Sequence, residues 1–156
     1  MKIVIASDHG GFELKTKIKA YLEKLADEKT AVNAGGDIIE MIEDLGAYDE
    51  TSVDYPEYGK KCAEKVVSGE YDKGIVVCGT GIGISIAANK VKGARCALCT
   101  SVHMAEMTRR HNDANLIALG GRTTEPELAL EIVKTWLEVD FEGGRHQRRV
   151  DMLDEM

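Results

Sequence analysis

The chain has 156 residues, of which 44% are hydrophobic, and it carries a formal charge of −7 at pH 7. This length predicts one domain with a sizeable core, and the negative charge argues against nucleic acid or a membrane surface as a partner. No stretch approaches the roughly 20 apolar residues of a membrane-spanning helix. Four cysteines without the spacing of a disulfide framework indicate reduced thiols, as in a cytoplasmic protein.

Short apolar runs alternate with longer amphipathic segments along the chain. Their content and periodicity predict strands over 2–7, 38–46, 74–78, 94–100 and 115–120. Helices are expected over 12–26, within 54–70, and over 83–91, 102–111 and 125–139. This alternation predicts right-handed crossovers and a five-stranded parallel sheet with helices on both faces, a Rossmann-like α/β three-layer fold.

Residues 27–37, DEKTAVNAGGD, separate the first predicted helix from the second predicted strand. The segment is long for such a connection. It fits a surface excursion, an extended helix end or a functional loop, and the sequence leaves the three open.

Residues 75–90, IVVCGTGIGISIAANK, place a cysteine and three alternating glycines between an apolar run and a small-residue helix. A dinucleotide-binding fingerprint would need a glycine at position 84, which is Ile84, and an acid near position 100, which is Thr100, so this pattern is absent. The ending of a phosphate-binding P-loop is absent, and a cysteine phosphatase loop would need arginine at Ile84. The remaining interpretation is a loop of backbone N–H groups at a helix N-terminus, which favours negative charge.

Cys78 ends the third predicted strand, where a buried cysteine is most often only a small hydrophobe. Its position favours a second interpretation, a reactive thiol. A helix N-terminus stabilises a thiolate, and open α/β sheets place their chemistry at the C-terminal edge, where Cys78 lies. Cys96 and Cys99 form C-x-x-C within a predicted strand. Residues three apart on a strand face opposite ways, which argues against a redox or zinc pair.

Asp8 and His9, in SDHGG, follow the first predicted strand at the same sheet edge as Cys78. Asp8 alone fits a helix N-cap. If the second strand lies outside the first, strands one and three are neighbours. Asp8, His9, Cys78 and Thr80 would then converge.

Arginines and histidines gather in RRHNDAN (109–115) and GGRHQRR (143–149), with Arg122 between them. In an acidic protein this pattern indicates an anion-binding site, since the arginine guanidinium can donate two parallel hydrogen bonds to one phosphate. Surface charge remains the interpretation for Arg109, Arg110 and Arg148, and a structural role remains open for His146.

The segments SDHGG, DYP, CGTGIGISIAANK, HNDAN and GGRHQRR, in this order, resemble the type B ribose-5-phosphate isomerases. The resemblance covers nearly the whole chain except about residues 27–37. Galactose-6-phosphate isomerase subunits share the Cys-Gly-Thr-Gly run but lack the HND segment, so the pentose branch is favoured. The resemblance implies strand order 2-1-3-5-4, an isomerase without metal or cofactor, and a homodimer.

The resemblance also implies residue roles. Cys78 would be the base that moves a proton between C1 and C2, a position where some family members carry glutamate instead. Thr80 and the loop amides of residues 79–83 would stabilise an enediolate, Asp8 would shuttle hydroxyl protons, and His111 would open the furanose ring. The residues implied for substrate and phosphate binding are His9, Tyr55, Gly79, Gly81, Ile82, Gly83, Asn112, Arg122, Arg145 and Arg149.

Topology predicts that one chain does not complete this site. Cys78 and Asp8 leave the C-terminal edge of the sheet, whereas His111 leads into the fifth strand at the opposite edge, roughly 17–20 Å away. We therefore expect His111 and Asn112 to serve a neighbour's Cys78 across a two-fold interface, together with Arg145 and Arg149 from a C-terminal tail over about 141–156. Dimer or tetramer stays open.

Three alternatives to a ribose-5-phosphate isomerase remain. The chain could act on another sugar phosphate such as allose 6-phosphate, or it could be a phosphosugar-binding regulator without chemistry. Retention of Cys78, Thr80, Asp8 and His111 argues against the regulator, since binding alone needs no thiol. A thiol redox protein using Cys96 and Cys99 is the weakest alternative.

Overall fold

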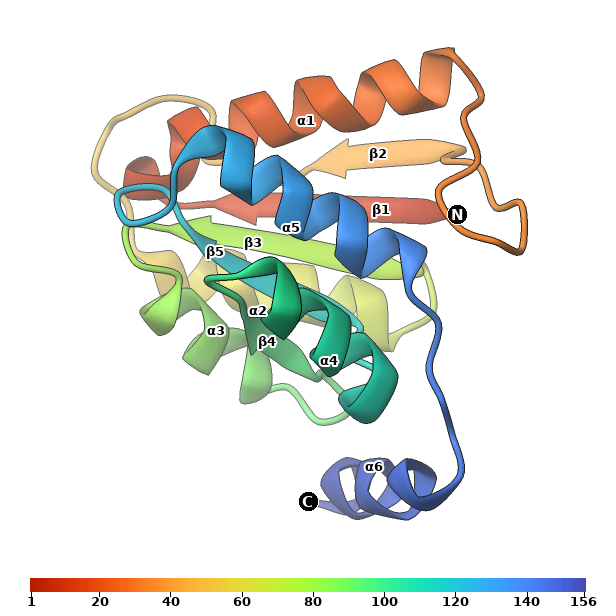
Figure 1. Cartoon of the computed structure of the whole chain (residues 1–156). Coiled ribbons are helices and arrows are strands. Elements are labelled where there is room, and N and C mark those ends of the chain that lie inside the picture. Colours follow the sequence, from red (N-terminus) through yellow and green to blue (C-terminus); the bar gives the residue numbers. More distant parts are fainter.

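Five parallel strands form the centre of the structure, a computed structural model that describes residues 1–156 (Figure 1). The strands are β1 (Lys2–Ser7), β2 (Met41–Asp44), β3 (Lys73–Cys78), β4 (Cys96–Leu98) and β5 (Leu116–Gly120). Their order is β2-β1-β3-β5-β4. The predicted parallel sheet and the strand order implied by the family resemblance are both confirmed.

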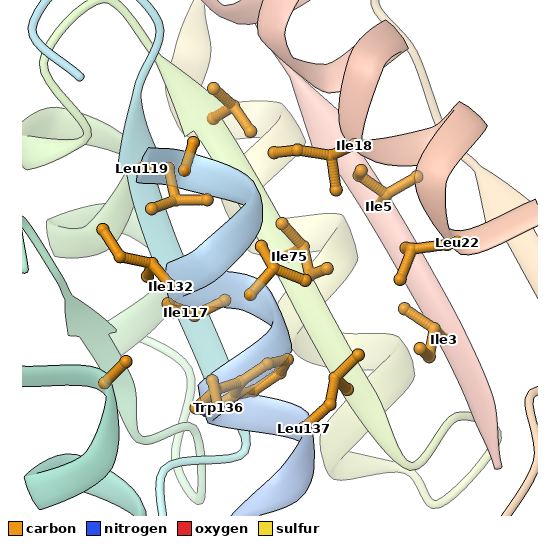
Figure 2. Packing of buried hydrophobic residues seen from close by; sticks show 14 of the residues in the cluster. Ile3, Ile5, Ile18, Leu22, Ile75, Ile117, Leu119, Ile132, Trp136 and Leu137 are labelled. Carbon is orange, nitrogen blue, oxygen red and sulfur yellow. The ribbon is translucent and has the colours of Figure 1, made fainter. Parts of the chain in front are cut away.

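Helices cover both faces of this sheet, because alternate residues of each strand point to opposite sides. Ile3 and Ile5 of β1 pack with one group of helices, and Val4 and Ala6 pack with the other. Figure 2 shows the first of these cores, in which Trp136 is fully buried. The first face is covered by α1 (Phe12–Asp27), α4 (Val102–Asn112) and α5 (Pro126–Glu138), and the second by α2 (Tyr55–Val67) and α3 (Ile82–Asn89).

The two edge strands are shorter than the sequence predicts. β2 occupies only Met41–Asp44 of the predicted 38–46, and β4 only Cys96–Leu98 of the predicted 94–100. Each edge strand pairs with only one neighbour, so fewer inter-strand hydrogen bonds hold the residues at its ends in the extended conformation. Ile39 is still buried in the core, although it lies in the loop before β2. No helix of the structure has both the length and the apolar character needed to cross a membrane.

Two segments differ from the simple alternation. Residues Arg145–Glu155 form a helix, α6, where the sequence suggested only a tail. Its buried residues are just His146 and Val150, and charged side chains fill most other positions, so the apolar periodicity is weak. Between α1 and β2, Val32 of the 27–37 segment is buried in the core, so this segment is more than a surface excursion.

Lys73 begins β3 with its ammonium 4.9 Å from the centroid of the Trp136 ring. Burial, and then the nearby charge of Arg109, lower the pKa of Lys73 from 10.5 to about 8. The unfolded chain binds more protons at this group between those two values, so its contribution to folding stability rises with pH across that window. Below pH 8 the charged form opposes folding.

Lys73→Met is therefore expected to raise the free energy of unfolding at pH 7 by about 1 kcal/mol, less than the full pKa difference implies because the ammonium partly reaches solvent. The gain should shrink as pH rises from about 8 to about 10.5. Urea unfolding at pH 7 and pH 10 measures it. Lys24→Met, at an exposed position, is the matched control; a gain that is the same at both pH values would contradict the prediction.

Candidate active site

Cys78 is the last residue of β3 and only 5% exposed. The backbone N–H of Gly81 donates a hydrogen bond to its Sγ at 3.1 Å. Gly81 has φ 79°, and a Cβ there would lie 2.9 Å from the backbone carbon of Leu119, so only glycine fits comfortably. The turn before α3 thus directs a backbone donor at the thiol sulfur, which favours negative charge there.

Thr80 lies on the exposed side of the same turn. Its Oγ1 accepts a hydrogen bond from the N–H of Ile82, the first residue of α3, at 3.3 Å. Tyr55, the first residue of α2, packs against Gly83, where a Cβ would meet the tyrosine ring at 2.6 Å from Cζ. The structure therefore brings Thr80, Tyr55 and the glycine loop together around the start of α3.

Asp8 is next to Cys78 across the sheet, because Ser7 pairs with Val77 in the parallel register. The Asp8 carboxylate is buried and accepts a hydrogen bond from the Gly11 N–H at 3.0 Å, as the N-cap of a short 3₁₀ helix, η1 (His9–Gly11). The expected N-cap role is confirmed, and it holds Asp8 at the sheet edge.

His9 has a defined orientation. Its Nδ1 accepts a hydrogen bond from the N–H of Val53 at 3.2 Å. A neutral ring therefore carries its proton on Nε2, which stays available as a donor to an anion. Sequence reasoning did not identify Val53, because the contact joins residues 44 positions apart.

A hollow of about 280 Å³ lies beside His9 and Arg122, and Gly10, Glu13, Glu50 and Gly121 complete its lining. The Arg122 guanidinium lies close to the backbone of Gly79, where an added Cβ would be 3.3 Å from its Nη1. The N–H of Arg122 donates to the Gly79 carbonyl at 2.9 Å, which ties the arginine to the cysteine loop. The donor groups of His9 and Arg122 thus face a hollow that the carboxylates of Glu13 and Glu50 also line.

The remaining predicted site residues lie elsewhere. Cys78 pairs with Gly120 at the end of β5, whereas Gly74 pairs with Leu116 at its start, and His111 and Asn112 come just before that start. In Figure 1 the end of α4 and the whole of α6 lie away from the tips of the strand arrows. We call Asp8, His9, Cys78, Thr80 and Arg122 the loop group, and His111, Asn112, Arg145 and Arg149 the α4–α6 group.

Next to the α4–α6 group, the ring of His146 stacks on that of His111 with centroids 4.3 Å apart. Glu142 lies beside them, and donor atoms of the three residues are within 4.8 Å of one another. Two histidines and a carboxylate are a zinc-type donor set. Stacked rings, however, direct their nitrogen lone pairs side by side, so one ring would have to turn before all three met one ion. Sequence reasoning had not included Glu142.

The other three cysteines are held as thiols. Burial raises the pKa of Cys62 and of Cys99 to about 12, and it also raises the pKa of Cys96. Cys96 packs against the core beneath α2 and α3 and Cys99 belongs to the opposite core, so the predicted opposite facing is confirmed. The redox alternative has no support in this arrangement.

We expect iodoacetamide at pH 7.5 to alkylate Cys78 first, because only a thiolate reacts and the other three thiols are protonated. Peptide mapping by mass spectrometry at short reaction times measures the order. Cys96→Ala is the control and should leave the labelling rate of Cys78 unchanged. Equal labelling of all four cysteines in the folded protein would contradict the expectation.

Comparison with known proteins adds independent information. A family model described as Ribose/Galactose Isomerase matches residues 3–153. Ribose-5-phosphate isomerase B of Escherichia coli (strain K12) is 43% identical over 152 residues, covering 97% of this chain and 93% of its own. The solved Clostridium thermocellum ribose-5-phosphate isomerase B has 52% identity and a TM-score of 0.88, covering 99% of this chain and 96% of its own. The Mycoplasma genitalium enzyme with bound ribulose-5-phosphate has 38% identity and a TM-score of 0.86, covering 99% and 94%.

Proposed function

This chain belongs to the Ribose/Galactose Isomerase family and is a sugar phosphate isomerase, and we propose that it interconverts ribose 5-phosphate and ribulose 5-phosphate. The relatives named as ribose-5-phosphate isomerases cover nearly its whole length, and one of them was solved with ribulose-5-phosphate bound. The observation that carries the chemistry is the Gly81 N–H donated to the Cys78 sulfur.

In the proposed mechanism, Cys78 removes a proton from one of the two reacting carbons and returns it to the other. A carbon next to a carbonyl is weakly acidic, so a positioned base is needed, typically worth 10²- to 10⁴-fold in rate. The intermediate is a cis-enediolate, whose charge Thr80 and the amides of residues 79–83 would stabilise. Each fixed donor is worth about 3 kcal/mol at such a site.

The other predicted residues act on the ends of the sugar. Asp8, buried beside Cys78, would shuttle hydroxyl protons, and Tyr55 and Asn112 would line the sugar. His111 would open the furanose ring. The phosphate would bind His9 and Arg122 in the hollow next to the loop, together with Arg145 and Arg149, and its binding energy would orient the reacting carbons.

The site would be shared between two copies of the chain, because the loop group and the α4–α6 group lie at opposite ends of the strands. Ile82 and Ile86, one turn apart on α3, are 52% and 55% exposed. An exposed apolar face of this kind beside the cysteine loop supports a subunit interface there. The proposed assembly is a homodimer, or a tetramer built from two such dimers, working in the cytoplasm without a metal or cofactor.

The test is turnover of ribose 5-phosphate by the wild-type protein in D₂O with metals chelated, followed by NMR. We expect ribulose 5-phosphate with solvent deuterium at the exchanging carbon. Allose 6-phosphate, the second candidate substrate, is assayed in parallel. Faster turnover of this hexose phosphate than of ribose 5-phosphate would replace the pentose assignment. Binding of both sugars without turnover of either would favour the regulatory alternative.

A further inference from the structure

Helix α6 has two distinct faces. His146 and Val150, one turn apart, are buried, whereas Arg145 and Arg149, also one turn apart, are exposed. The helix therefore packs on the domain through the side that carries His146 and presents both arginines to solvent. Any group that fixes His146 also fixes the direction in which these arginines point.

The buried side of α6 meets the end of α4 through two imidazole rings. His111 and His146 stack with planes 16° from parallel. His146 is 7% exposed, and His111 is only partly buried. The His146 ring is therefore the enclosed partner, and it supplies a flat surface that limits how the more exposed His111 ring can tilt.

Neighbouring groups hold His146 in this place. Glu142 Oε2 lies 3.7 Å from its Nε2. Glu142 is itself anchored on α4, where its N–H donates to the Arg110 carbonyl at 3.1 Å and its carboxylate lies 3.6 Å from the Arg110 guanidinium. Burial, and then the charges of His111 and Arg145, lower the pKa of His146. A neutral His146 can stack on His111 without repelling a proton carried there.

We propose that His146 is a positioning residue, whose ring holds His111 in the orientation needed for ring opening and joins it rigidly to Arg145 and Arg149 on α6. This inference rests on the proposed function, because it assigns a task to the group that supports His111. It differs from a merely structural role: the loss of His146 should impair the step that needs His111 more than the enediolate step at Cys78.

Two substrates separate these steps. Ribose 5-phosphate is mostly a closed furanose, whereas ribulose 5-phosphate cannot form a furanose because its O5 carries the phosphate. Turnover of the first therefore needs ring opening, and exchange of deuterium from D₂O into the second needs only the enediolate chemistry. His111→Ala, measured on both, supplies the reference pattern for a ring-opening defect.

Three variants test the proposal. His146→Ala should lower kcat for ribose 5-phosphate by about 10- to 100-fold, as expected for a misplaced reacting group, while exchange into ribulose 5-phosphate falls far less. His146→Phe keeps a flat ring and should recover most of the lost activity. Asp154→Asn is the matched control, because Asp154 binds Arg95 at 2.6 Å and secures the far end of α6 away from His111. It should resemble wild type on both substrates.

The outcomes separate the two proposals. Wild-type protein that neither turns over ribose 5-phosphate nor exchanges ribulose 5-phosphate overturns the proposed function, and this inference with it. If the wild type is active, only the inference is at stake, and any of three results would overturn it. The first is full activity in His146→Ala, and the second is no recovery in His146→Phe. The third is that His146→Ala and Asp154→Asn both lose activity, equally on the two substrates. The last result would mean that His146 merely docks α6.

Discussion

Cys78→Ala is expected to lower isomerisation of ribose 5-phosphate by 10² to 10⁴-fold, the typical worth of a positioned general base. Solvent deuterium should also stop entering the sugar, because alanine cannot accept the proton from carbon. NMR in D₂O measures both quantities in one sample. The loop should stay folded, since the positive-φ glycine and helix α3 hold the turn, although the Gly81 N–H loses its sulfur acceptor.

Cys96→Ala is the matched control for this experiment, because it removes a thiol that burial keeps protonated. It should retain wild-type turnover, and both variants should show the circular dichroism of the wild type. Turnover that survives in Cys78→Ala would move the base elsewhere, with the buried Asp8 carboxylate as the next residue to replace.

Mixed dimers of Cys78→Ala and His111→Ala chains are expected to regain activity that neither variant has alone. If one subunit supplies the cysteine and the other the histidine, each mixed dimer contains one site with both native residues and one with neither. Random mixing makes half of the dimers mixed, so about a quarter of wild-type activity should return. Joint refolding of the two variants followed by the isomerase assay measures the recovery.

The control mixes Cys78→Ala with Asp8→Asn, two changes within the loop group. Both residues leave the same edge of neighbouring strands, so every mixed dimer would have one defect in each site and no activity should return. No recovery in the first mixture would place His111 and Cys78 of a single chain in one site and contradict the shared-site proposal. Recovery in the control would mean that Asp8 and Cys78 of one chain do not share a site, which would contradict the loop group.

Strong local signals predicted most of the fold and the loop group. The runs at 2–7, 74–78 and 115–120 became β1, β3 and β5, because central strands are buried on both faces and their apolar content is continuous. The glycines of the cysteine loop also mark a backbone position that few other residues can adopt. Neighbouring strands then bring Asp8 next to Cys78, a result that follows from strand order.

Weaker signals left other parts undetermined. α6 has only two buried residues among charged ones, so its helical face is hidden until the domain supplies a surface for it. The edge strands β2 and β4 were predicted too long, because their ends depend on pairing with a single neighbour. The contacts of Glu50 and Val53 near His9 arise from a loop without any regular pattern.

The sequence by itself determined the parallel α/β fold, the cysteine loop and the segregation of site residues to two ends of the strands. Apolar periodicity is a local property, and the alternation of strands with helices sets the direction of the strands. Only the tertiary structure decided which side chains touch: the Gly81 N–H on Cys78, the Val53 N–H on His9, and the stacked rings of His111 and His146. Such contacts join residues distant along the chain, and their geometry depends on how helices and loops pack on the finished sheet.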